Sequence, residues 1–152
     1  MTIEHNPAKP LRPKRPLPLR LILWIFVLWS VLGWLRFGRA LAERELIISL
    51  VGPPLFGYLL LAGLIGGLFA LPVIWGLIFR APWTPIALPL AAAFYPVLYW
   101  FERLLLWQDP YAHRNWPLMV LLTLAWAGLV LWGLRAAHKR GFFTDKRDRE
   151  RG

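Results

Sequence analysis

The stretch from Pro54 to Phe79, PLFGYLLLAGLIGGLFALPVIWGLIF, decides the fold class of this chain. It contains no Asp, Glu, Lys or Arg, and it is longer than the roughly 20 apolar residues that a helix needs to cross a lipid bilayer. Its regularly spaced small residues are also typical of membrane helices. We therefore expect this stretch to form a transmembrane helix.

Three further segments carry the same signature. No Asp, Glu, Lys or Arg occurs in residues 21–35, 81–101 or 116–134. The whole chain is 58% hydrophobic with a mean hydropathy of +0.49, whereas soluble domains contain about 45–50% apolar residues. A soluble fold would have to bury all four blocks with too little polar sequence to cover them. The sequence thus predicts an all-α membrane protein with four transmembrane helices.

The transmembrane domain is predicted at residues 19–136, with spans at about 19–37, 54–79, 85–106 and 116–134. The basic, proline-rich segment 1–18 is expected to be a disordered tail, and the basic segment 137–152 a second tail. Short connections favour an antiparallel bundle. Pro72, Pro89 and Pro96 lack a backbone N–H group, so we expect kinks in the second and third helices.

Lys and Arg are concentrated at the two ends of the chain, in residues 9–20 and 135–151. The formal net charge is +10, from 18 Lys and Arg against 8 Asp and Glu. Because basic flanks stay on the cytoplasmic side, we predict an N-in, C-in topology. The same residues are expected to attract anionic lipid head groups. This topology suits a prokaryotic cytoplasmic membrane, and the absence of a basic folded face argues against a nucleic-acid partner.

A cleavable signal peptide is the alternative interpretation of the first span, because a basic start and an apolar core precede Ala40-Leu41-Ala42. Several bulky tryptophans in the core, and Arg36 and Arg39 near the site, argue against cleavage. We expect Arg20 and Arg36 to reach opposite head-group regions. The segment 40–50 is expected to lie on the outer surface as one or two amphipathic turns.

Small residues recur along the second span. Ala62, Gly66 and Ala70 are spaced by four, and Gly63 and Gly67 form a G-x-x-x-G motif on the adjacent ridge. Such ridges let two helices approach closely where lipid removes the hydrophobic incentive to associate. We expect them to pack within the same bundle. Contact with another membrane protein, or with a second copy of the chain, is the alternative.

Glu102 is the only acidic residue inside a predicted span, and an ionisable group within a span is a functional-site hypothesis. It lies about one turn from the outer end of the third span. Helical spacing places it on one face with Tyr95, Tyr99 and Arg103. The candidate polar site comprises Tyr58, Tyr95, Tyr99, Glu102, Arg103, Arg114 and Asn115. It could line an outward cavity, bind an anionic or polar head group, form an ion pair, or simply reach surface water.

Positive support for an enzyme is missing from the sequence. The chain has no cysteine, which excludes thiolate catalysis and Cys-ligated metals. His5, His113 and His138 lie outside the spans, so haem ligation is not expected. No hydrolase, phosphate-binding or zinc motif is present, and we expect no cofactor or metal.

We therefore predict a non-catalytic subunit or scaffold that packs against partner membrane helices. The small-residue ridges and the tryptophan-rich spans favour this interpretation. One alternative is a small transporter or lipid-binding protein that uses the polar site near the outer end of the third helix. A membrane enzyme acting on a lipid-linked substrate is the least favoured.

Overall fold

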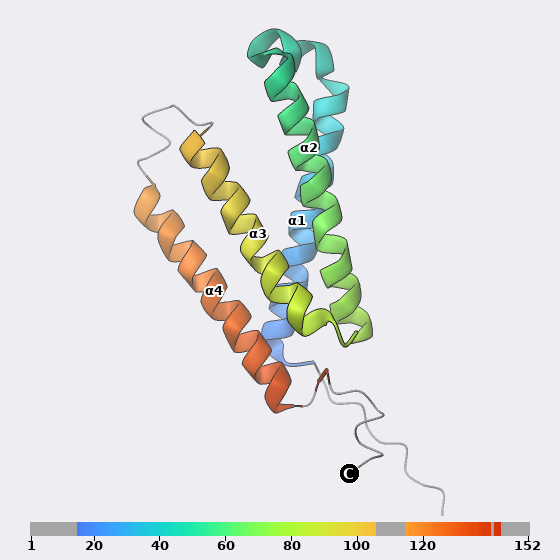
Figure 1. Cartoon of the computed structure of the whole chain (residues 1–152), viewed down its shortest axis with the longest axis vertical. Coiled ribbons are helices and arrows are strands. Elements are labelled where there is room, and N and C mark those ends of the chain that lie inside the picture. Colours follow the sequence, from blue (N-terminus) through green and yellow to red (C-terminus); the bar gives the residue numbers. More distant parts are fainter. Residues whose placement is uncertain (1–14, 106–114, 141, 144–152) are drawn as a thin grey trace, which may run out of the picture.

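The computed structural model describes residues 15–105, 115–140 and 142–143 of the chain. These residues fold into four helices, α1 (Leu17–Ala42), α2 (Arg44–Phe79), α3 (Thr84–Leu105) and α4 (Trp116–Lys139) (Figure 1). All four are long and apolar enough to cross a bilayer. The predicted all-α fold with four potential membrane spans is confirmed.

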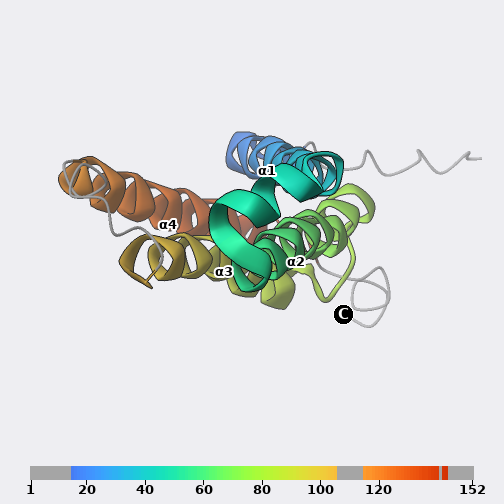
Figure 2. The ribbon, with the colours of Figure 1, turned by 90° about the horizontal axis from the view of Figure 1, so that it is seen from above.

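The helices contact one another in a ring, α1 with α2 and α4, and α3 with α2 and α4. The contact between α1 and α2 is the most extensive, and these two helices lie side by side in both views (Figures 1 and 2). Helices α3 and α4 form a second pair that diverges from the first toward the upper end of Figure 1. The first residues of α1 and the last of α4 lie together at the lower end.

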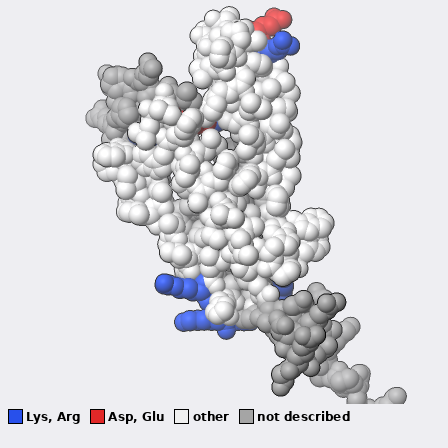
Figure 3. Space-filling view, viewed as in Figure 1, with Lys and Arg blue, Asp and Glu red and all other residues white. Residues whose placement is uncertain are grey.

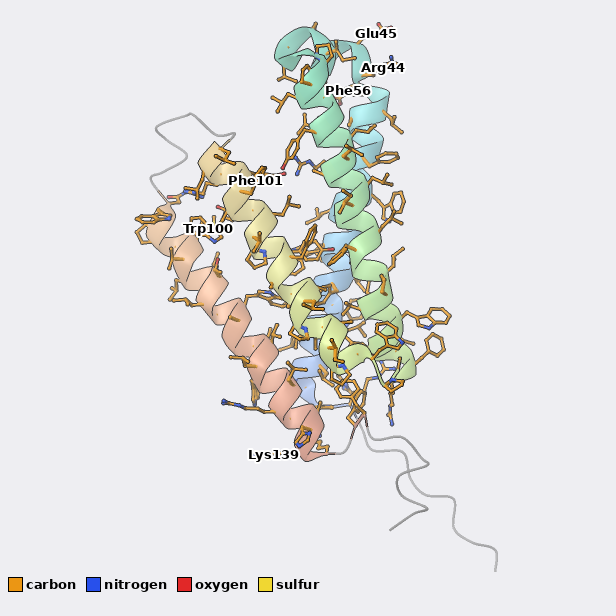
Figure 4. All side chains as sticks on the ribbon, in the orientation of Figure 1. Arg44, Glu45, Phe56, Trp100, Phe101 and Lys139 are labelled. Atoms are coloured by element: carbon orange, nitrogen blue, oxygen red, sulfur yellow. The ribbon has the colours of Figure 1, made fainter. Side chains whose placement is uncertain are left out.

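A break near the start of α2 separates a short helical segment from the long span. Gly52 has a non-helical backbone with φ 80° and ψ 164°, which glycine adopts readily because it lacks a Cβ. Pro53 and Pro54 follow, and neither can donate a backbone hydrogen bond. Residues 44–51 therefore fold over the upper end of the bundle, where Figure 4 labels Arg44 and Glu45.

Glycines allow the close approach of α1 and α2. A Cβ added to Gly63 would lie 2.8 Å from the backbone nitrogen of Phe37, and one added to Gly33 would lie 2.8 Å from the backbone carbon of Gly66. Real Cβ atoms essentially never come so near to other heavy atoms. Only glycine therefore fits at these crossing points.

An aromatic cluster fills the middle of the bundle and connects all four helices. Trp29 of α1 stacks on Tyr95 of α3 with ring centroids 4.3 Å apart, and Trp126 of α4 meets Trp29 edge-on at 4.8 Å. The fully buried Phe26 contacts the rings of Tyr95 and Trp126. The Tyr95 hydroxyl donates a hydrogen bond of 2.6 Å to the carbonyl of Gly66 in α2.

The lower end of the bundle is closed by residues from both ends of the chain. Arg15 Nη2 donates a hydrogen bond of 2.8 Å to the carbonyl of Ile78, near the C-terminus of α2. The guanidinium of Arg80 lies 4.6 Å from the ring centroid of the buried Phe142, a favourable cation–π geometry. These contacts hold the helices together at the lower end, opposite to the end where the α3–α4 pair diverges from the α1–α2 pair.

Between its two ends, the face of the molecule in Figure 3 is almost entirely uncharged. In the most apolar stretch of α2, 44% of the residues are buried inside the chain. The corresponding shares for α1, α3 and α4 are 17%, 22% and 11%. Helix α2 is thus more enclosed than the other three helices. The other three helices leave most of their apolar surface uncovered by the described residues.

Candidate functional site

Glu102 of α3 accepts hydrogen bonds from two other helices. Its Oε1 atom lies 2.8 Å from Nη1 of Arg36 on α1 and 2.9 Å from the hydroxyl of Tyr58 on α2. The Glu102 side chain is 13% exposed and that of Arg36 is 35% exposed. The ion pair is therefore partly buried, and a single carboxylate oxygen joins α1, α2 and α3. We call Arg36, Tyr58 and Glu102 the Glu102 cluster.

The three helices bring the Glu102 cluster together because each of its members lies near the upper end of a span. Arg36 precedes the end of α1 at Ala42, and Glu102 precedes the last described residue of α3, Leu105. Tyr58 follows the break at Gly52. Each is within about two turns of the end of its span, at about 3.6 residues per turn. The cluster thus lies near the upper end of the bundle.

The pairing of Arg36 with Glu102 was missed by the sequence interpretation, which directs Arg36 to the head groups. A basic residue near one end of the first span and an acid near the same end of the third span were the available signals. An unpaired charge within an apolar span is unfavourable, so a basic and an acidic residue near the same end of two spans are expected to form an ion pair. The sequence interpretation did, however, place Tyr58 and Glu102 in the same candidate site, and the structure joins these two side chains.

Arg103 has a different environment from that of its neighbour Glu102. Its side chain is 2% exposed, it donates a hydrogen bond to the hydroxyl of Tyr99, and its guanidinium lies 5.8 and 5.9 Å from the rings of Tyr99 and Trp100. Successive residues of a helix point about 100° apart, so residues 102 and 103 face different neighbours. Tyr99 and Arg103 therefore form a second polar contact, separate from the Glu102 cluster.

Two of the remaining predicted site residues, Tyr95 and Asn115, do not join either group. Tyr95 lies in the aromatic cluster and binds the carbonyl of Gly66. Asn115 is exposed at the start of α4, and its side chain makes no capping hydrogen bond. Arg114 lies outside the described residues. The predicted site thus divides into separate contacts, and among the described site residues the Glu102 cluster is the one that contains an ion pair.

The small residues predicted for helix packing are enclosed by the chain itself. Ala62, Gly63, Gly66, Gly67 and Ala70 are all buried. Gly63 faces the backbone of α1, and a Cβ on Gly67 would lie 3.1 Å from Nε1 of Trp34, also in α1. The carbonyl of Gly67 accepts a hydrogen bond of 3.0 Å from Ser30. In the isolated chain this ridge is therefore occupied by α1 and by Tyr95 of α3.

The Glu102 cluster retains unused polar groups. Both hydrogen bonds to Glu102 end on Oε1, and within the described part of the chain no donor reaches Oε2. Arg36 donates through Nη1 alone to these residues, although a guanidinium has five N–H groups. A carboxylate accepts up to about four hydrogen bonds. The cluster can therefore bind a further polar partner without breaking its ion pair.

An apolar groove lies between α3 and α4. Its volume is about 390 Å³, and its lining is almost wholly apolar. The lining residues are Pro89, Ala92, Ala93, Pro96 and Val97 on α3, and Thr123, Trp126, Ala127, Val130 and Leu131 on α4. The groove contains no charged side chain, so it is suited to an apolar ligand or helix.

No protein-family model, curated protein or solved structure matches this chain. Within residues 15–105, 115–140 and 142–143, no group of three His, Cys, Asp or Glu residues could hold a metal ion. Among the described residues, the Glu102 cluster and the α3–α4 groove are the features that bear on function.

Proposed function

We propose that this chain is a multi-pass cell-membrane protein with four antiparallel spans, kinked at the prolines of α2 and α3, and with both ends in the cytoplasm. The described basic residues of the lower end are Arg15, Arg20, Arg80, Arg135, Lys139 and Arg140. At the upper end, Arg39 and Arg44 are accompanied by Glu43 and Glu45. The excess of basic residues at the lower end supports a cytoplasmic location for it. A prokaryotic cytoplasmic membrane, whose anionic head groups would bind the basic tails, suits this arrangement.

We infer that the protein acts as a non-catalytic subunit or scaffold, and that the α3–α4 groove is where it holds a partner membrane helix. The groove extends about 12 Å along each helix, at about 1.5 Å per residue. Ala93 and Ala127 lie in its lining, and small side chains of this kind allow another helix to come close. The groove is the observation that carries this proposal.

A partner helix fits the groove better than disordered lipid tails do. Because lipid tails are as apolar as leucine, helices associate in membranes through close van der Waals packing. Helix α4 has little of this packing within the chain, since only 11% of its most apolar stretch is buried. The glycine ridge of α2 already packs against α1. The α3–α4 surface is therefore where a partner would add the most contact.

Site-specific photo-crosslinking in native membranes tests this proposal. We expect benzoylphenylalanine at Ala127, in the groove, to form one discrete protein adduct, whereas the same group at the exposed Leu61 of α2 forms none. Filling the groove with Ala93→Trp is expected to abolish the adduct. Crosslinks from Ala127 to lipid alone would overturn the proposal. An adduct of twice the chain's mass would identify the partner as a second copy.

A further inference from the structure

We propose that the Glu102 cluster binds the head group of a zwitterionic phospholipid that carries a primary ammonium group, the chemistry of phosphoethanolamine. The phosphate would accept hydrogen bonds from the unused N–H groups of Arg36. The ammonium would donate to the open Oε2 atom of Glu102. The lipid comes from the leaflet that meets the upper end of the bundle in Figure 1.

Charge balance selects a zwitterion for this position. Arg36 and Glu102 form a salt bridge with no net charge. A simple anion would be attracted by Arg36 but repelled by Glu102, and a simple cation would meet the opposite pair of forces. A zwitterion can place each of its charges against the complementary one. The ion pair is thereby extended to four alternating charges and remains neutral.

The depth and accessibility of the Glu102 cluster fit a lipid head group. Figure 3 shows acidic and basic atoms in a recess of the otherwise uncharged belt, in the upper half of the molecule. The side chains of Glu102 and Arg36 are 13% and 35% exposed, so both are accessible from outside the bundle. The recess is open from the side, where lipid would stand.

Apolar side chains beside the cluster can contact the acyl chains. Leu32 of α1 lies one helical turn from Arg36, and Leu61 of α2 lies one turn from Tyr58, both toward the middle of the bundle. These two side chains are 51% and 55% exposed. A lipid whose polar group occupies the recess would therefore find apolar surface extending from it toward the middle of the membrane.

Hydrogen bonding distinguishes ethanolamine from choline at this site. A primary ammonium has three N–H donors, whereas the trimethylammonium of choline has none. Only the former can bond to Oε2 of Glu102, which accepts no hydrogen bond from the described residues. Hydrogen bonds to charged groups are among the stronger ones in proteins. Affinity should consequently fall as methyl groups replace the ammonium hydrogens.

The first test uses the wild-type full chain in detergent and native mass spectrometry. Dissociation constants are measured for phosphatidylethanolamine, its N-methyl and N,N-dimethyl forms and phosphatidylcholine, all with the same acyl chains. We expect phosphatidylethanolamine to bind about tenfold more tightly than phosphatidylcholine, with a graded loss between them. Equal affinities across the series would overturn the proposal, whatever any variant does.

A second test asks whether Glu102 causes the preference for phosphatidylethanolamine over phosphatidylcholine. Glu102→Gln is expected to bring the affinity for phosphatidylethanolamine to that for phosphatidylcholine, while the affinity for phosphatidylcholine is unchanged. The control is Glu43→Gln, which makes the same substitution at an acid of the upper end that pairs with Arg39, and it should leave the preference intact. If Glu102→Gln does not fold, Tyr58→Phe spares Oε2 and should retain the preference. Loss of the preference in Glu43→Gln would contradict the assignment.

Free phosphoethanolamine separates a lipid from a soluble ligand. We expect it to displace bound phosphatidylethanolamine only weakly, because it lacks the acyl chains that Leu32 and Leu61 would contact. Displacement at the same concentration as a short-chain phosphatidylethanolamine would overturn the lipid assignment.

Discussion

The indole of Trp126 on α4 donates a hydrogen bond of 2.9 Å to the carbonyl of Ala92 on α3. This carbonyl is the one that would normally bind the N–H group four residues later, where Pro96 has none. Membrane helices tolerate proline where a neighbouring helix supplies the missing partner. The Trp126–Ala92 hydrogen bond thus lets α3 continue past Pro96, and it ties α3 to α4.

Replacing Trp126 with Phe should destabilise the protein by about 1 kcal/mol, because the carbonyl of Ala92 loses its partner in an apolar environment. Unfolding by increasing SDS in mixed micelles measures this change. Trp132→Phe is the matched control, since Trp132 lies on the same helix and is 54% exposed. In a Pro96→Ala background, residue 96 can itself bond to Ala92, so Trp126→Phe should have a smaller effect. An equal effect in both backgrounds would contradict the explanation.

Gly63→Ala should destabilise the α1–α2 contact by about 1–3 kcal/mol, the range typical of overpacking. The added Cβ would lie 2.8 Å from the backbone of Phe37, which cannot move as a flexible side chain does. Gly57→Ala is the control, because nothing lies within 4 Å of its added Cβ. The same unfolding measurement compares the two. A Gly63→Ala variant as stable as Gly57→Ala would exclude close packing at this crossing.

The Arg36–Glu102 pair should contribute more to stability than the exposed Arg39–Glu43 pair. Breaking the former with Glu102→Gln leaves Arg36 without its partner and is expected to lower stability by about 1–2 kcal/mol, reduced from the value of a fully buried pair by the exposure of Arg36. A double-mutant cycle with Arg36→Gln measures the coupling. For Arg39–Glu43, spaced i, i+4, we expect only about 0.3–0.5 kcal/mol. Similar couplings for both pairs would show that the bundle does not shield Glu102.

Single cysteines test the topology directly, because the chain has no cysteine of its own. Ser49→Cys lies at the upper end and His138→Cys at the lower end, and both positions are exposed. On intact cells, a membrane-impermeant maleimide should label position 49 at once and position 138 only after permeabilisation. The reverse order of labelling would refute the cytoplasmic placement of the chain ends.

The sequence by itself determined that the chain forms four long apolar helices. Spanning length and the absence of charge are local properties, and a helix satisfies its own backbone hydrogen bonds in an apolar medium. The break near Pro53 and Pro54 is also a local property, since proline removes a hydrogen-bond donor at its own position. The sequence also placed Tyr58 and Glu102 in one candidate site, because Tyr58 lies near the start of the second span and Glu102 near the end of the third, and antiparallel neighbours bring these ends together.

Only the tertiary structure decided which of the polar side chains meet. Arg36 and Glu102 are 66 positions apart, and their contact depends on the rotation and tilt of α1 against α3. Likewise, Glu102 and Arg103 have different partners because each lies on a face of α3 that meets a different neighbour. Helical periodicity specifies which residues share a face, but it does not specify what that face contacts. That choice is made by the packing of the whole bundle, through glycine crossings such as that of Gly33 and Gly66.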